Sequence, residues 1–278
     1  MNYLFQIINS IFSANAPNML HLVDSNKAGK NFNNEPAVNW KSLFRSSEDS
    51  FTSSIFGLLF YLPAELFWEI LKQSIYNCPD LPDPGKLIGY EFWPSWKNSG
   101  GNRVEPDIFA EFEHLDLIIE AKRYDKDQQS FSQWDNQLSA YCESVNRKEN
   151  LYLLAIGGIW DGDKQVTDLS LDDQHCRVLK CRWTLLLQTI TVLQKAAEKQ
   201  QGTSSDIAQL NVFRDLLLAF RIHGFQTGTL LEFMPTRFAI DNSIEALIPI
   251  LRLDIPIQLM PIPLNYKIRN FKNLIEKL

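Results

Sequence analysis

Three charged residues, Asp107, Glu120 and Lys122, have the types and the spacing to form one small catalytic site. Pro106 and Asp107 precede one apolar segment, and Glu120-Ala121-Lys122 ends the next, with only a short polar corner between the two segments. Strands joined in this way are expected to pair antiparallel. Because side chains alternate between the two faces of a strand, Glu120 and Lys122 point the same way, and Asp107 is expected beside Glu120 on the paired strand.

This set of side chains suits metal-assisted hydrolysis of a phosphodiester. Carboxylate oxygens are the ligands that Mg²⁺ or Mn²⁺ prefers, and Mg²⁺ takes its remaining ligands from water and substrate phosphate. A divalent ion lowers the pKa of a bound water and offsets the charge that develops on the phosphate. An ammonium such as that of Lys122 can donate a hydrogen bond to the attacking water or to a non-bridging oxygen.

Charge is unevenly distributed in the chain. Residues 101 to 127 include eight acidic and four basic residues, a local balance of −4 that suits a divalent cation. The whole chain has a net charge of −6, which argues against a protein that coats nucleic acid through bulk charge. Four basic residues flank the proposed site and are candidates for phosphate contacts: Lys97, Arg103, Arg123 and Lys126.

The segments around this site predict helices and strands in a regular order. Ser46 with Asp49 resembles a capping box, and apolar residues at helical spacing follow. A continuous apolar run, residues 151 to 157, predicts a strand covered on both faces. The expected elements are helices 46–62 and 63–76, a strand 87–93, a turn region 94–101, strands 107–112 and 116–122, a helix 130–145 and a strand 151–157.

The helix expected over residues 130 to 145 carries a polar stripe. Gln133, Gln137 and Tyr141 are four residues apart, so they lie along one side of that helix. An amphipathic helix with glutamines there by chance is the alternative interpretation.

The motif Pro106-Asp107, twelve intervening residues and Glu120-Ala121-Lys122 resembles the signature of the PD-(D/E)XK nuclease superfamily. Gln137-Leu-Ser-Ala-Tyr141 is similar to the QxxxY element that lies beside the active site in RecB-like exonucleases of that superfamily. The resemblance covers residues 46 to 157. It implies that Asp107 and Glu120 bind Mg²⁺ or Mn²⁺, that Lys122 is the catalytic lysine, and that Gln137 lies alongside.

The superfamily usually has a further acidic residue on the helix before the first strand. We take Glu48 as this catalytic and metal-binding residue, because it opens a predicted helix. Glu65 and Glu69 on the next helix are rivals. An acid in a first helical turn is also favoured by the helix dipole alone, by ~0.3–1 kcal/mol, so the position has a simple structural explanation as well.

The resemblance implies an α/β protein with a restriction-endonuclease-like mixed β-sheet core flanked by helices and a mostly helical C-terminal extension. The expected division is an N-terminal helix and loop (1–45), the nuclease-like core (46–182) and a helical C-terminal region packed on the core (183–278). That last region and the end of the core are expected to hold a strand at 177–183, a helix at 184–200, a helix to about residue 223 capped by Ser205 or Asp206, and a closing helix at 266–278.

The apolar runs and the cysteines of the chain argue against a membrane protein and against a disulfide-rich or zinc-binding protein. It has no run of eighteen apolar residues, so no membrane partner is expected, and the apolar N-terminus has no preceding basic residue, so we expect a cytoplasmic protein. Four cysteines without a CxxC pair argue against a disulfide framework or a zinc site, and Cys176 and Cys181 are interpreted as buried strand residues.

Two hypotheses follow. The first is a Mg²⁺-dependent nuclease acting on DNA in restriction, repair or phage defence, as a homodimer or with partner subunits of such a system. The alternative is a catalytically silent nuclease-fold subunit that serves as a nucleic-acid-binding or assembly module. The acidic net charge favours the second, and the intact Asp107, Glu120 and Lys122 set favours the first.

Overall fold

The computed structural model describes residues 19–25, 39–124, 128–145, 148–160, 163–199 and 203–226. The chain divides into two compact units, residues 1–225 and residues 226–278. All of the elements described below belong to the first unit. Within the described residues, no helix is both long enough and apolar enough to cross a membrane.

A six-stranded mixed sheet forms the centre of this unit. Its strand order is β1-β4-β5-β6-β8-β7. Strands β1, β4 and β5 pair antiparallel, β5, β6 and β8 pair parallel, and β7 pairs antiparallel with β8. The strands are β1 (Leu87–Phe92), β4 (Ile108–Phe112), β5 (Asp116–Ala121), β6 (Leu151–Ile156), β7 (Thr167–Leu171) and β8 (Gln174–Cys181).

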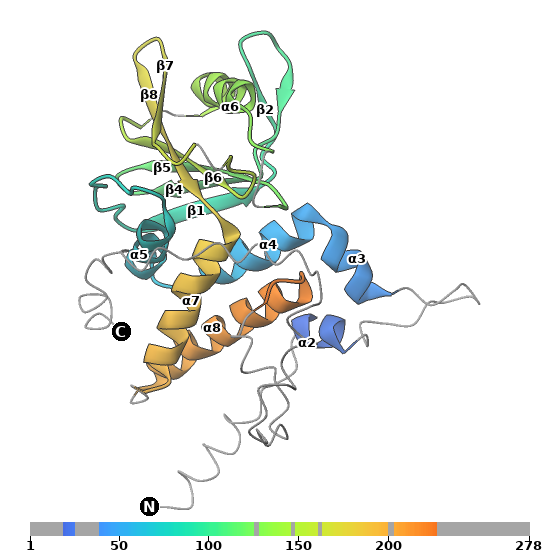
Figure 1. Ribbon diagram of the computed structural model, residues 1–278. Coiled ribbons are helices and arrows are strands. Elements are labelled where there is room, and N and C mark those ends of the chain that lie inside the picture. The colour runs from blue at the N-terminus through green and yellow to red at the C-terminus, as the bar shows by residue number, and fades with distance from the viewer. Residues whose placement is uncertain are drawn as a thin grey trace, which may run out of the picture. The chain divides into compact units, whose positions relative to one another are not determined.

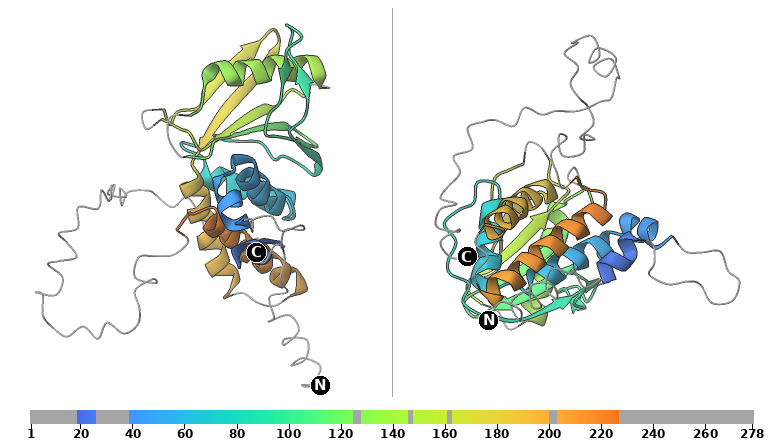
Figure 2. Two further views of the ribbon diagram at one scale, coloured as in Figure 1. Left: turned by 90° about the vertical axis from the view of Figure 1, so that its right-hand side faces the viewer. Right: turned by 90° about the horizontal axis from the view of Figure 1, so that it is seen from below.

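Helices cover both faces of the sheet. In Figures 1 and 2, α6 lies on one face, while α4, α5, α7 and α8 lie on the other. Helices α7 and α8 pack on each other, α4 packs on α8, and α5 packs on α7. The helices are α2 (Met19–Asp24), α3 (Trp40–Ser46), α4 (Glu48–Leu59), α5 (Ala64–Ser74), α6 (Phe131–Ser144), α7 (Trp183–Ala197) and α8 (Ser204–Ile222).

The two central strands are largely apolar because both of their faces are covered. Every residue of β5 and of β6 is buried, which confirms the prediction made from the continuous apolar run at 151 to 157. On the α6 side, Ile118 and Leu153 pack with Trp134 and Leu138 of α6. Any polar side chain on β5 that points toward α6 therefore lies in a buried environment.

The predicted order of helices and strands around the site is confirmed. Strands β4 and β5 are antiparallel, with Ile108 paired to Ile119, so Asp107 comes directly before the strand that runs beside Glu120. The mixed α/β architecture with helices on both faces is also confirmed. Cys176 and Cys181 are buried in β8, as interpreted from the sequence.

The starts of three helices differ from the predicted starts by one to a few residues. Ser47 caps α4 by accepting a hydrogen bond from the Ser50 N–H, because Ser46 is still the last residue of α3. Thr203 caps α8 in a reciprocal capping box with Asp206, in place of Ser205 or Asp206 as the cap. Helix α7 begins at Trp183, slightly earlier than expected.

Three short strands were missed. The expected turn region 94–101 contains β2 (Trp96–Lys97), which pairs with β3 (Arg103–Val104) as a separate hairpin. Strand β7 was not predicted, and β8 runs from Gln174 to Cys181 where 177–183 was expected. Strands β2 and β3 have two residues each, which is too short an alternation for a sequence pattern to reveal. Of the expected N-terminal helix and loop (1–45), residues 19–25 and 39–45 are described, and they hold α2 and most of α3, which were not predicted as separate helices. The region 227–278, with the expected closing helix 266–278, lies outside the described residues.

Candidate active site

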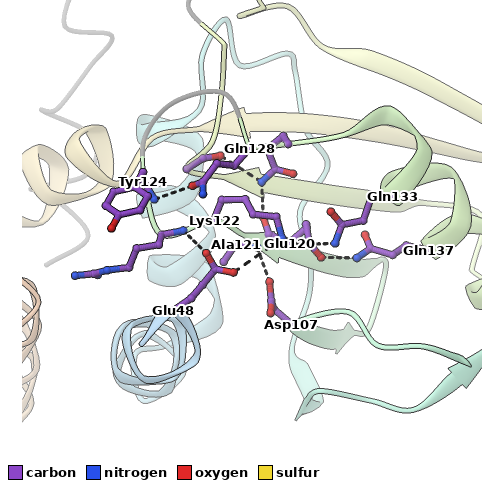
Figure 3. A network of polar contacts seen from close by, with 12 residues as sticks. Glu48, Asp107, Glu120, Ala121, Lys122, Tyr124, Gln128, Gln133 and Gln137 are labelled. Atoms are coloured by element: carbon purple, nitrogen blue, oxygen red, sulfur yellow. Dashed lines mark hydrogen bonds and ion pairs between the residues drawn. The ribbon is translucent and has the colours of Figure 1, made fainter. Parts of the chain in front are cut away.

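Lys122 lies between two carboxylates at the carboxyl end of β5. Its ammonium contacts Glu120 Oε1 and lies 4.0 Å from Glu48 Oε1 at the start of α4 (Figure 3). Glu120 is only 2% exposed, whereas 18% of the Lys122 side chain remains exposed. The structure thus brings a buried carboxylate and a partly exposed lysine side chain to the same point at the end of the sheet.

Asp107 joins this group from the neighbouring strand. Its Oδ2 accepts a hydrogen bond of 2.7 Å from the backbone N–H of Ala121, between Glu120 and Lys122 (Figure 3). The antiparallel register places Asp107 at this position, because Ile108 is paired with Ile119. Asp107 and Glu120 therefore lie beside each other, as the sequence predicted.

The glutamines of α6 hold the Glu120 carboxylate. Gln133 Nε2 donates to Glu120 Oε1 over 2.7 Å, and Gln137 Nε2 donates to Glu120 Oε2. One turn further along the same side of the helix, the Tyr141 hydroxyl donates to Asp116 Oδ2 over 2.7 Å. The polar stripe of α6 is thus paired with the two acids of β5 that face it, Asp116 and Glu120. Chance glutamines on an amphipathic helix would not show this matched pairing.

Asp107 and Glu120 are held in an environment that opposes their ionisation. Burial raises the pKa of Asp107 to about 7, and the negative charge of Glu120 acts in the same direction. Burial also raises the pKa of Glu120, although Lys122 opposes that shift. Burial alone would lower the pKa of Lys122, but the Glu120 carboxylate raises it above its ordinary value. Lys122 favours the ionised form of both carboxylates, but burial outweighs it and keeps their pKa values raised.

Glu48 is the acid of the three alternatives that the structure brings to the site. Besides facing Lys122, its Oε2 accepts a hydrogen bond from the backbone N–H of Arg123. Glu69 on α5 forms an ion pair with Lys72 over 2.7 Å. Glu48 is therefore both a first-turn acid of α4, favoured by the helix dipole, and a neighbour of Lys122.

Sequence reasoning missed one further residue that contacts the site. Gln129 Nε2 donates to the carbonyl oxygens of Glu120 and Gly157, at 3.0 and 3.2 Å, and its Oε1 accepts from the Trp134 indole. The residue precedes α6 in a loop, so it has no helical or strand periodicity that could have revealed it.

The basic residues proposed for phosphate contacts behave differently from one another. The Arg123 guanidinium donates to the backbone carbonyls of Arg45 and His223, so it is not a solvated surface group. Arg103 is exposed and forms an ion pair with Glu105. Lys97 is exposed on β2, and Lys126 lies outside the described residues.

The carboxylate oxygens of the site are of the type that binds a hard divalent cation, but they are not arranged as a preformed metal site. In the parts of the chain that the structure describes, no group of three or more His, Cys, Asp and Glu side chains is placed to hold a metal ion. Lys122 and the two glutamines occupy the oxygens of Glu120, whereas a backbone N–H donates to Asp107 Oδ2. Asp107 and Glu120 are the two carboxylates whose raised pKa values an added cation would lower.

Comparison with known proteins gives little beyond this geometry. No family model matches the chain. An uncharacterized protein of Pasteurella multocida (strain Pm70) is 39% identical over 124 residues, which are 44% of this chain and 46% of that protein. The chain therefore aligns with less than half the length of this relative, whose name states no activity.

Proposed function

We propose that the protein is a Mg²⁺- or Mn²⁺-dependent nuclease of the restriction-endonuclease-like fold that hydrolyses phosphodiester bonds in DNA. We further propose that it acts in the cytoplasm, in restriction, phage defence or repair, as a homodimer or with partner subunits. One observation carries the proposal. Asp107, Glu120 and Lys122 come together at the ends of two paired strands, and Glu48 reaches them from a helix about sixty residues earlier in the chain.

Each of these side chains has a proposed role. Asp107, Glu120 and Glu48 are the residues that would hold the divalent ion, and such an ion supplies an acidified water and offsets charge on the phosphate. Lys122 donates a hydrogen bond to the attacking water or to a non-bridging phosphate oxygen. Gln133 and Gln137 favour the ionised form of the Glu120 carboxylate and fix its orientation, because both donate to it.

Cleavage of DNA in the presence of Mg²⁺ or Mn²⁺ tests the proposal. Asp107→Asn and Lys122→Met keep the approximate size of each side chain and remove its charge, and each should lower the rate by about 100-fold or more. Lys72→Met is the matched control, because Lys72 pairs with Glu69 on the surface of α5. Cleavage that continues at the wild-type rate in both site variants would refute the assignment.

A second function keeps the fold and lacks catalysis. In it, the protein is a nucleic-acid-binding or assembly subunit, and Lys122 permanently takes the position of the cation. The observation that favours it is that no three acidic, histidine or cysteine side chains among the described residues are arranged for a metal. Titration calorimetry with Mn²⁺ separates the two functions. Heat of binding that disappears in Asp107→Asn supports the nuclease, and equal behaviour of both proteins supports the silent subunit.

A further inference from the structure

The peptide that joins Lys122 to Arg123 is held from both sides by the helical layer. The carbonyl oxygen of Lys122 accepts a 2.7 Å hydrogen bond from the Trp183 indole N–H at the first position of α7. The N–H of Arg123 donates to Glu48 Oε2 at the first position of α4. Two helices that are far apart in the sequence thus fix one peptide unit, and Lys122 projects from it.

The close approach of Trp183 depends on a glycine. Gly157 follows β6 with a φ of 70°, and a Cβ placed there would lie 2.1 Å from the Lys122 carbonyl oxygen and 2.7 Å from the Trp183 indole nitrogen. A side chain at this position would separate the indole from the carbonyl. The Lys122 carbonyl and the Trp183 indole therefore occupy the space that a side chain at position 157 would need.

The side chain of Arg123 extends the same attachment to two more helices. Its Nη2 donates to the carbonyl oxygens of Arg45, in the last turn of α3, and of His223, the C-cap residue of α8. The carbonyls at a helix C-terminus lack partners within the helix and carry partial negative charge, so a guanidinium is a favourable partner for them. Arg123 thereby joins the ends of α3 and α8 to the end of β5.

An aromatic cluster supports this arrangement from the helical side. The Arg123 guanidinium carbon lies 5.0 Å from the centre of the Phe51 ring on α4. Phe51 in turn contacts the rings of Trp183, Phe220 and Phe225, at 4.3, 5.5 and 5.0 Å between centres. Residues from α4, from α7 and from the end of α8 therefore pack together directly against the residue that follows Lys122.

We infer that Trp183 and Arg123 are positioning residues, which make helices α7 and α8 part of the machinery that places Lys122. The inference deepens the proposed nuclease function, on which its catalytic meaning rests. Neither side chain needs to touch substrate, since each acts through the peptide that carries the lysine. Helices α7 and α8 are then components of the site, and not only a cover for the sheet.

Chemical labelling of lysines tests the inference without relying on activity. Acetic anhydride is applied to the metal-free protein, and the acetylation rates of Lys122 and Lys180 are measured by peptide mass spectrometry. Lys180 is only 1% exposed and pairs with Asp163, so its rate reports general loosening. The variants are Trp183→Phe, Arg123→Met and Arg123→Lys. Arg177→Met is the control, because it removes an arginine paired with Asp168 on the far strands of the sheet.

We expect Trp183→Phe and Arg123→Met each to raise the Lys122 rate about tenfold while the Lys180 rate stays unchanged, as for a local release of one segment. Arg123→Lys should fall between Arg123→Met and the wild type, and Arg177→Met should match the wild type. An unchanged Lys122 rate, or parallel increases at Lys122 and Lys180, would overturn the inference.

Cleavage kinetics add a second readout that separates this inference from the proposed function. If the wild type cleaves DNA, Trp183→Phe should lower kcat about tenfold and leave KM within about threefold. A change confined to KM would contradict positioning of the lysine. If the wild type does not cleave DNA, the nuclease proposal fails, and the labelling rates still decide whether Trp183 and Arg123 place Lys122.

Discussion

Tyr141 and Asp116 form a hydrogen bond of 2.7 Å between β5 and α6, at the end of the contact opposite to Glu120. The same hydroxyl accepts a 2.9 Å hydrogen bond from the Lys148 N–H, and the Lys148 ammonium lies 3.1 Å from Asp116 Oδ1. Burial raises the pKa of Asp116, so this acid depends on its donors to stay ionised. Helix α6 is therefore hydrogen-bonded to β5 at two points, by Tyr141 to Asp116 and by Gln133 and Gln137 to Glu120.

Tyr141→Phe should reduce the free energy of unfolding by about 1–3 kcal/mol, because a buried carboxylate loses a hydrogen-bond donor. Urea denaturation measures the change. Tyr61→Phe is the control, since Tyr61 is 75% exposed, and a change within about 0.5 kcal/mol is expected there. Equal losses in the two variants would contradict a specific role for the Tyr141 hydroxyl.

Gln137→Leu should lower the cleavage rate, or the affinity for Mn²⁺, by roughly 10–100-fold, the usual effect of removing a group that orients a metal ligand. The reason is that Glu120 Oε2 loses a buried donor while its apolar surroundings remain. Asn136→Ala, at an exposed position of the same helix, serves as the control. Rates that fall equally in both variants would indicate damage to α6 in general.

The raised pKa of Asp107 predicts that the stability of the metal-free protein depends on pH. This pKa is raised to about 7 by burial and then by Glu120. The stability gained from the protonated form is fully present below the ordinary pKa of an aspartate and is lost as the pH rises through about 7. An asparagine side chain does not titrate, so the wild type should lose stability relative to the Asp107→Asn variant between about pH 4 and pH 7.

Thermal unfolding of both proteins across that pH range checks this prediction. The difference in Tm between them should grow steadily toward neutral pH, and added Mn²⁺ should reduce it, because a cation stabilises the ionised carboxylate. A difference that stays constant with pH would show that Asp107 has an ordinary pKa.

Gly157→Ala should destabilise the protein by about 1–3 kcal/mol, because the new methyl group would lie against the Lys122 carbonyl and the backbone is left-handed there. Gly57→Ala is a matched control with the opposite sign. Gly57 lies inside α4, and apart from the adjoining backbone of that helix no atom lies within 4 Å of an added Cβ, so alanine should stabilise the helix by about 0.5–1 kcal/mol. Differential scanning calorimetry measures both, and a neutral Gly157→Ala would refute the tight packing around this peptide.

The parts of the site that are close together in the sequence were predictable from it. Asp107 directly precedes β4, Glu120 lies near the end of β5 and Lys122 directly follows it, and a three-residue corner joins the two strands, so the twofold alternation of strand side chains places all three. Gln133 and Gln137 follow from the helical period in the same way. In both cases the geometry is set by neighbouring residues, and a local pattern carries the needed information.

The tertiary structure alone decided which distant groups complete the site. Glu48, Glu65 and Glu69 all stand on predicted helices, and only the packing of α4 against the end of β5 brings Glu48 to Lys122. Trp183 reaches Lys122 across 61 residues, and Arg123 reaches His223 across 100. Such contacts depend on how whole helices pack on the sheet. No residue pattern repeats over that separation. The sequence therefore determined which residue types carry the chemistry, and the tertiary structure decided which distant side chains surround them.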